Sequence, residues 1–221
     1  MRYSIAHLHY ISQEMEGHDL LIDIEEACKG GVRWVQLRLK NKNERDIIAI
    51  AKKVKGICQK YSAVFIVNDY ANIAVEVDAD GVHLGKQDMD ITEARRLLGR
   101  EKIIGGSTNS FEDIIKLNEL SADYVGLGPF RFTTTKEKLN PILGEKGINA
   151  IMKKIKSAHI KIPVIAIGGI GLSDVEMLID YGVYGVAVSS AINGANNIKG
   201  VAKNFMEALE LSKRRVSNVF N

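Results

Sequence analysis

Residues 34–67 read WVQLRLKNKNERDIIAIAKKVKGICQKYSAVFIV. In residues 34–40 polar or aromatic side chains alternate with aliphatic ones, as in a strand that has two different faces. In residues 43–61 apolar side chains recur three or four positions apart, which indicates an amphipathic helix, and residues 64–67 form a second apolar run. A strand, a helix and a strand in this order predict two parallel strands joined by a helical crossover.

The same alternation of a short apolar run with a helical pattern recurs along the whole chain. Strand candidates begin near Leu8, Trp34, Val64, Gly81, Ile103, Tyr124, Val164 and Gly185. Eight such units predict an α/β fold of the TIM (β/α)8 barrel type, with residues 1–221 as a single catalytic domain. An open doubly wound sheet would have fewer strands and a glycine-rich turn after the first strand, where residues 11–14 read ISQE.

The bulk composition narrows the classes of partner. The net charge of +3 is spread along the 221 residues without a basic block, so we expect no nucleic-acid partner. No apolar run approaches the ~20 residues of a membrane span, and the first residues lack the features of a signal peptide. The two cysteines lack metal-ligand spacing, which favours a reduced, cytoplasmic setting. A homo-oligomer is compatible with the sequence, which leaves the oligomeric state open.

Polar residues gather where the predicted strands end, which is where TIM barrels carry their active sites. In the strand that begins at Trp34, alternation places Gln36, Arg38 and Lys40 on the inner side of the barrel. Because an unpaired buried charge is costly, these two cations need a partner. An anionic ligand is one interpretation, and a salt-bridged core or a solvated strand end is the other.

Two carboxylates and a serine follow the next strands. Asp69 follows Asn68 at the end of the run 64–67, and Asp88 comes after the run 81–85. Together they could share a magnesium ion, which prefers one or two carboxylates plus water and phosphate oxygens, although a turn or a helix cap would also explain them. Ser107 ends residues 103–107 and is free to point at a ligand. His83 is interpreted as a hydrogen-bonded core residue rather than a catalytic one.

The last three strands are followed by groups suited to phosphate. A long loop, residues 129–147, contains Thr133, Thr134, Thr135 and Lys136, whose hydroxyl and ammonium donors suit an anion, and whose alternative is an ordinary surface loop. Gly168 and Gly169 follow the seventh strand, and Ser189 and Ser190 the eighth. Phosphate is often bound at these two strand ends, although glycines also serve tight turns.

Several short motifs in this order resemble the thiamine phosphate synthase family almost from end to end. They are QxRxK at 36–40, VND at 67–69, ADGVHLGxxD at 79–88, DYVGLGP at 123–129, TxTK at 133–136 and GGI at 168–170. The chain departs from the family's pattern at Lys86, where glutamine is frequent, and at Thr108 and Asn109. The resemblance implies a TIM barrel that condenses hydroxymethylpyrimidine pyrophosphate with thiazole phosphate, with Mg2+, to give thiamine phosphate and pyrophosphate. The mechanism it implies is dissociative and needs no general base.

The resemblance also implies a role for each matching residue. Asp69 and Asp88 resemble the magnesium ligands, and Gln36 a contact on the pyrimidine side. The residues that resemble pyrophosphate contacts are Arg38, Lys40, Asn68 and Lys136. Thr133 and Thr135 resemble contacts to either of the two phosphate groups, whereas Gly169, Ser189 and Ser190 resemble the thiazole-phosphate cradle. Ser107 resembles the serine beside the reacting pyrimidine, and Arg38, Lys40, Ser107 and Lys136 together make up the expected catalytic set.

Three other functions compete with this interpretation. A thiazole tautomerase of the same family is expected to carry an acid–base histidine just after the fifth strand, where this chain has Asn109. A phosphate-binding regulator would bind without turnover. A barrel enzyme acting on a sugar phosphate would keep the glycines and serines but would not need Asp69, Asp88 and Lys136 together.

Overall fold

Eight strands alternate with helices in the computed structural model, which describes residues 4–132 and 141–219. The strands are β1 (Leu8–Ile11), β2 (Trp34–Leu37), β3 (Val64–Asn68), β4 (Gly81–Leu84), β5 (Ile103–Thr108), β6 (Tyr124–Leu127), β7 (Val164–Ile167) and β8 (Gly185–Val188). The helices are α1 (Leu20–Lys29), α2 (Glu44–Lys60), α3 (Ala71–Glu76), α4 (Ile91–Leu98), α5 (Phe111–Glu119), α6 (Gly144–Ser157), the 3-10 turn η1 (Leu172–Asp174), α7 (Val175–Asp180), α8 (Ser190–Asn193) and α9 (Ile198–Val219). Each strand begins at the residue where the sequence predicts it.

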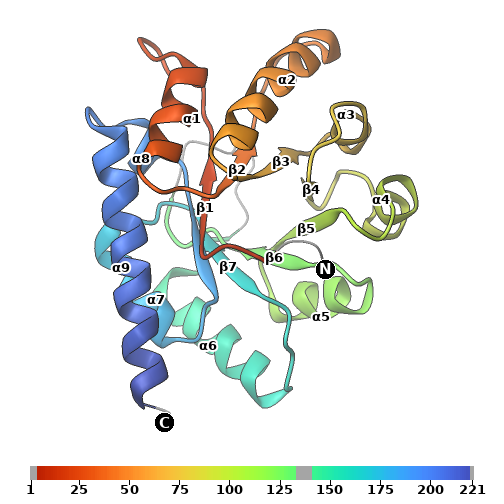
Figure 1. Ribbon diagram of the computed structural model, residues 1–221. Helices are drawn as coiled ribbons and strands as arrows, with labels where there is room; N and C mark the ends of the chain where they lie inside the picture. The colour runs from red at the N-terminus through yellow and green to blue at the C-terminus, as the bar shows by residue number, and fades with distance from the viewer. Residues whose placement is uncertain (1–3, 133–140, 220–221) are drawn as a thin grey trace.

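The strands form a closed barrel in which every neighbouring pair is parallel. Their order follows the chain from β1 to β8, and β8 closes onto β1 with Leu8 opposite Val186. Figure 1 shows the strands at the centre and the helices around them. The TIM-barrel prediction is therefore confirmed.

The crossover that joins β2 to β3 shows why the helices form where they do. The side chain of Asn43 accepts a hydrogen bond from the backbone N–H of Asp46 at 2.9 Å and caps the start of α2. Of the apolar residues spaced three or four positions apart in this helix, Ile47, Ala51, Val54 and Cys58 are buried. The helix is thus amphipathic, and its apolar face holds it on the sheet.

The apolar core has two layers. A small cluster inside the barrel contains Trp34, Ile66 and Tyr124, and a larger one lies between the strands and the helices. The alternation in β2 is confirmed, because Trp34 lies inside while Val35 and Leu37 belong to the outer layer. Because side chains alternate between the two faces, the later inward-facing residues of β2 lie close to the end of the barrel at which the strands finish.

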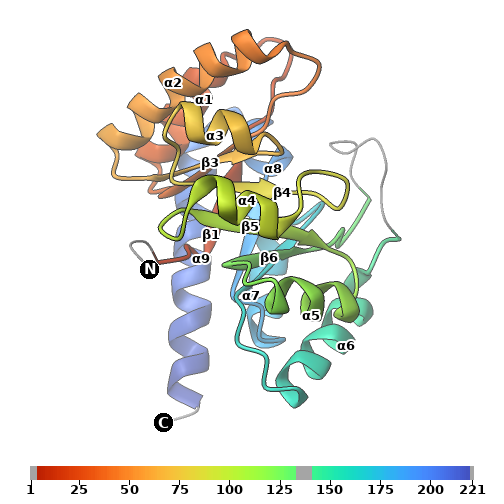
Figure 2. The same cartoon turned by 90° about the vertical axis from the view of Figure 1, so that its right-hand side faces the viewer.

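Two helices follow the last strand. Four-residue α8 begins one residue after β8, and the long helix α9 then runs down the side of the barrel, packed along α1 and α7 (Figures 1 and 2). A short extra helix after strand eight is a common place for a phosphate in TIM barrels. Across the described ranges, no helix combines the length and the apolar character needed to cross a membrane.

Candidate active site

A cavity of about 380 Å³ opens at the carboxyl ends of the strands, and all eight strands contribute to its wall. Nine of the residues predicted for the site line it together, namely Gln36, Arg38, Asn68, Asp69, Asp88, Ser107, Gly169, Ser189 and Ser190. They are far apart in sequence, and the closed barrel brings them to one surface. The size suits a small-molecule ligand.

Lys40, Thr133, Thr135 and Lys136 are the other residues that the sequence predicts for the site. Lys40 is half-buried beyond the end of β2 and is not among the residues that line the cavity. Thr133, Thr135 and Lys136 lie outside the described residues. Their expected roles stay predictions from the family resemblance.

Two amides on neighbouring strands are paired with each other. The Nε2 atom of Gln36 donates to the Oδ1 atom of Asn68 at 2.7 Å, and both side chains are buried. Because the oxygen of Asn68 is used in this bond, its NH2 group is directed elsewhere and can donate to a ligand. The pair therefore presents a donor on the side of the cavity that Arg38 also lines.

Arg38 contributes a cation to the same side. Its backbone N–H donates to the hydroxyl of buried Ser12 at 3.1 Å, which ties the end of β2 to the end of β1. The side chain is half-buried at the cavity wall, where a guanidinium suits the planar oxygens of phosphate. Lys86, which departs from the family's pattern, also lines the cavity and pairs with Asp113 at 2.6 Å.

Asp69 and Asp88 approach the cavity from turns after β3 and β4. Asp69 has a φ of 70°, and its backbone N–H donates to the carbonyl of His83 at 2.8 Å. One carboxylate oxygen of Asp88, Oδ2, accepts from the N–H of Gly85 at 2.6 Å, which holds that side chain at the cavity edge. The helix cap is Asp90, whose Oδ1 accepts from the N–H of Thr92, so Asp88 does not cap α4.

This donor set fits magnesium better than a transition metal. Two carboxylates beside open space match an ion that keeps water or phosphate oxygens in its other positions. Within the ranges 4–132 and 141–219, no group of three or more histidine, cysteine, aspartate or glutamate side chains gathers as a metal cage. Asp69 and Asp88 are therefore the residues that could hold Mg2+.

The opposite wall is built from glycine and serine. Gly168 and Gly169 have φ values of 98° and 66°, and a Cβ at Gly169 would lie 2.9 Å from the Cβ of Arg131. These glycines thus serve a tight turn and a close contact between two loops, and they also line the cavity. Ser189 and Ser190 stand at the start of α8, whose first N–H groups have no carbonyl within the helix to bond.

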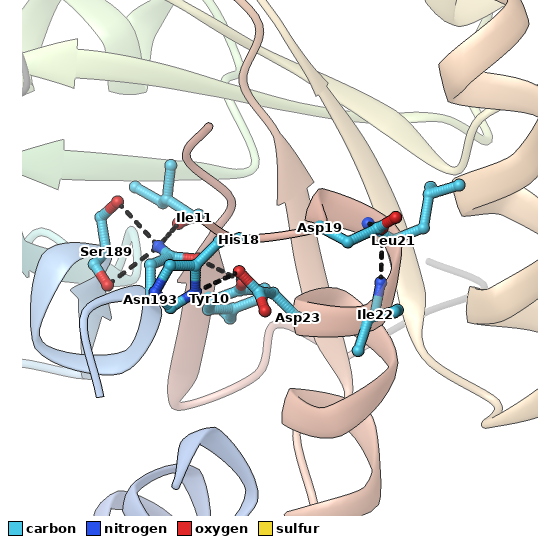
Figure 3. A network of polar contacts seen from close by, with 9 residues as sticks. All are labelled: Tyr10, Ile11, His18, Asp19, Leu21, Ile22, Asp23, Ser189 and Asn193. Atoms are coloured by element: carbon cyan, nitrogen blue, oxygen red, sulfur yellow. Dashed lines mark hydrogen bonds and ion pairs between the residues drawn. The ribbon is translucent and has the colours of Figure 1, made fainter. Parts of the chain in front are cut away.

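A buried amide fixes the start of α8 (Figure 3). Asn193 donates from Nδ2 to the carbonyls of Ile11 and Ser189, each at 2.9 Å, and to the hydroxyl of Ser189 at 3.2 Å. Its Oδ1 accepts from the hydroxyl of Tyr10, and burial raises the pKa of that phenol. One side chain therefore joins the end of β1 to the serine turn that borders the cavity.

An ion pair joins the loops that follow β6 and β7. Arg131 donates through both terminal nitrogens to Asp174, with Nη2 at 2.7 Å from Oδ1, and Asp174 also accepts from the N–H of Gly171 at 2.8 Å. The Arg131 guanidinium is the main reason that the pKa of Asp174 is lowered, against the opposing effect of burial. This pair anchors residues 129–132 beside the glycine turn.

His83 lies at the floor of the cavity, although the sequence did not indicate that it belongs to the site. His83 is hydrogen-bonded and buried, as expected, but it also lines the cavity. Ser107, which was expected to be free for a ligand, bonds to His83 at 3.0 Å. The position of His83 near the carboxyl end of β4 was the one signal in the sequence that could have placed it here.

Asn109 stands where a tautomerase would carry its histidine. Its Nδ2 atom donates to the carbonyl of Gly128 at 2.8 Å and to the carbonyl of Pro141 at 3.0 Å. An amide cannot exchange a proton as an imidazole does, and this one holds the two ends of a loop. The structural role of Asn109 therefore disfavours acid–base chemistry at this position.

A closed parallel barrel with a polar cavity at the carboxyl ends of its strands defines a TIM-barrel protein with the site layout of an enzyme. The family model described as thiamine monophosphate synthase matches residues 8–192. The chain belongs to this family.

Individual relatives agree with the family match. The chain is 47% identical to the thiamine-phosphate synthase of Flavobacterium johnsoniae over 91% of this chain and 95% of that protein. It is 44% identical to the thiamine-phosphate synthase of Persephonella marina over 90% of this chain and 95% of that one. Among solved structures, the thiamine phosphate pyrophosphorylase from Pyrococcus furiosus matches with a TM-score of 0.82 and 32% identity, covering 93% of this chain and 96% of that one.

Proposed function

We propose that the chain is a thiamine-phosphate synthase. It joins 4-amino-5-hydroxymethyl-2-methylpyrimidine pyrophosphate to 4-methyl-5-(2-phosphoethyl)thiazole, or to its carboxy form, and releases pyrophosphate. The observation that supports this most is that one cavity is lined both by Arg38, Asp69 and Asp88 and by the glycine–serine wall after β7 and β8. Two phosphate-bearing ligands that react with each other need two such regions in one space.

The pyrophosphate would lie on the side of Arg38 and Asn68. The guanidinium and the amide NH2 donate to oxygens whose charge grows as the carbon–oxygen bond breaks, which lowers the barrier. By family resemblance, Lys40 and Lys136 are further proposed donors. Asp69 and Asp88 are the proposed Mg2+ ligands, and a bound Mg2+ supplies positive charge to the pyrophosphate oxygens.

The thiazole phosphate would lie against Gly169, Ser189 and Ser190, with Thr133 and Thr135 serving either phosphate. The bond between the pyrimidine methylene carbon and the pyrophosphate oxygen breaks first, and pyrophosphate leaves with the electron pair. The 4-amino group of the pyrimidine stabilises the resulting cation, and the lone pair of the thiazole nitrogen then forms the new carbon–nitrogen bond. No proton leaves the attacking nitrogen, so the reaction needs no general base.

The setting we propose is cytoplasmic, with small molecules as substrates. Cys28 and Cys58 are free and buried, and burial raises the pKa of Cys28 to about 11, so its thiol is protonated. Buried thiols of this kind are compatible with a reducing compartment.

The direct test mixes both substrates with Mg2+ and measures thiamine phosphate and pyrophosphate. We expect both products in equal amounts. Isomerisation of the carboxythiazole phosphate without coupling would instead indicate a tautomerase. Tight binding of either phosphate ester without turnover would indicate a regulator.

Asp69→Asn is the sharpest variant for the proposed metal site. Asparagine tolerates the left-handed backbone conformation that Asp69 adopts at φ 70°, so the substitution removes the charge with little added strain. We expect coupling to fall by at least about 100-fold. Asp78→Asn is the matched control, because Asp78 also has a positive φ of 51° but pairs with Lys55 and Lys102 away from the cavity. Coupling near the wild-type rate in Asp69→Asn would remove Asp69 from the site.

A further inference from the structure

Three side chains from adjacent strands form a hydrogen-bonded chain beneath the cavity. The Nδ1 atom of His83 in β4 lies 3.0 Å from the hydroxyl of Tyr124 in β6, and its Nε2 atom lies 3.0 Å from the hydroxyl of Ser107 in β5. Tyr124 is 1% exposed and His83 is 6% exposed, whereas Ser107 reaches the cavity wall. These three hydrogen-bonded side chains therefore connect the core of the barrel to the floor of the cavity.

Two glycines in the barrel, Gly105 and Gly126, leave the space that Tyr124 and His83 occupy. A Cβ at Gly105 would lie 2.1 Å from Cζ and 2.6 Å from the hydroxyl oxygen of Tyr124. A Cβ at Gly126 would lie 3.3 Å from Cε1 of His83. Any larger residue at Gly105 would displace the phenol ring, so the position of the tyrosine depends on a neighbour without a side chain.

Tyr124 determines which atom is the donor in each of the two hydrogen bonds. Burial raises the pKa of Tyr124, so its hydroxyl keeps its proton. Among the described residues, the hydroxyl has one hydrogen-bond partner, Nδ1 of His83. A buried O–H without an acceptor costs about 1–3 kcal/mol, so the phenol donates and Nδ1 accepts.

The donor in the second hydrogen bond, between His83 and Ser107, then follows from the protonation of the imidazole. A neutral histidine that accepts at Nδ1 carries its proton at Nε2 and donates it to the Ser107 oxygen. The hydroxyl proton of Ser107 has no acceptor among residues 4–132 and 141–219 and can point into the cavity. The floor of the cavity thus presents an O–H donor.

We propose that Tyr124 and His83 are positioning residues that orient Ser107 as a hydrogen-bond donor to a ring nitrogen of the pyrimidine substrate. This assignment rests on the proposed function, because the acceptor belongs to that substrate. A ring nitrogen of a neutral aminopyrimidine accepts a hydrogen bond, whereas the exocyclic amino group offers donors. The three hydrogen-bonded side chains would therefore select which edge of the pyrimidine ring meets the floor of the cavity.

The first experiment tests the proton direction without any substrate. Nitrogen-15 NMR of the imidazole side chains in the ligand-free protein reports which nitrogen carries the proton, and His83→Gln identifies the His83 signals among the five histidines. We expect a protonated Nε2 and an unprotonated, hydrogen-bonded Nδ1. In Tyr124→Phe, the Nδ1 signal moves toward that of a nitrogen without a hydrogen bond. A proton on Nδ1 in the wild type would overturn the proposal.

The second experiment tests whether the tyrosine acts through the serine. We expect Tyr124→Phe to lower kcat/KM for the pyrimidine substrate about fivefold to tenfold, the size of one neutral hydrogen bond. In a Ser107→Ala background the same change should have less than about a twofold effect, because the group it orients is gone. Losses that multiply in the double variant would overturn the proposal.

Tyr184→Phe is the matched control. Tyr184 donates its hydroxyl to the carbonyl of Ile5 at 2.9 Å, and it is not one of the residues that line the cavity. We expect this variant to leave the His83 signals and kcat/KM unchanged. If the wild-type protein does not couple the two substrates, the proposed function and the acceptor assigned to Ser107 both fail. The NMR result would still decide the direction of the protons.

Discussion

Asn193→Ala is the substitution whose effect on stability follows most directly from the structure. Asn193 is fully buried, and its amide is the partner of the Tyr10 hydroxyl and of the carbonyls of Ile11 and Ser189 (Figure 3). Truncation to alanine leaves these three groups without it. Ser189 borders the cavity, where water can replace the lost donor, so two buried groups carry most of the cost.

A buried donor or acceptor that loses its partner costs about 1–3 kcal/mol, and partial relaxation favours the lower half of that range. For the two buried groups together, we therefore expect the free energy of unfolding to fall by about 2–4 kcal/mol. For a chain of this length, that loss corresponds to a decrease in Tm of about 4–16 °C. The same change would loosen the serine turn and raise KM for the thiazole phosphate.

Equilibrium unfolding in urea measures the free energy, provided that the dependence on urea concentration is unchanged. Asn118→Ala is the control, because Asn118 is exposed on α5 and alanine favours helix. Tyr10→Phe, which removes only one of the bonds, should lose about 1 kcal/mol. A loss of less than about 1 kcal/mol in Asn193→Ala would refute the reasoning that this amide satisfies buried groups.

Two further predictions concern packing and pH. Gly105→Ala should destabilise the protein by about 1–3 kcal/mol, because its Cβ would collide with the Tyr124 ring, whereas Gly56→Ala on the open face of α2 should stabilise it by about 0.5–1 kcal/mol in the same urea assay. Because the pKa of Asp174 is lowered in the folded state, chiefly by Arg131, its contribution to stability is present above the usual pKa of 3.8 and is lost as pH falls through the lowered value. Asp174→Asn should therefore show a smaller decrease in the urea midpoint than the wild type between about pH 5 and about pH 3, and equal decreases would contradict this role.

The sequence by itself determined the elements and nine of the residues that line the cavity. The alternation in residues 34–40 and the helical spacing in residues 43–61 are local patterns with periods of two and 3.6, so they can be read without knowing what lies nearby. Once eight such units predict a barrel, the rule that sites form at strand ends is enough to bring together residues such as Gln36, Asp69 and Asp88.

Only the tertiary structure decided which of these polar groups bond to one another. Strand pairing set the neighbours, so Gln36 bonds to Asn68, and His83 lies between Tyr124 and Ser107. No local pattern carries this information, because each partner is 24 residues or more away along the chain and the contact exists only after the barrel closes. Burial then gives these contacts their effect, since a polar group removed from water must find its partner inside the protein.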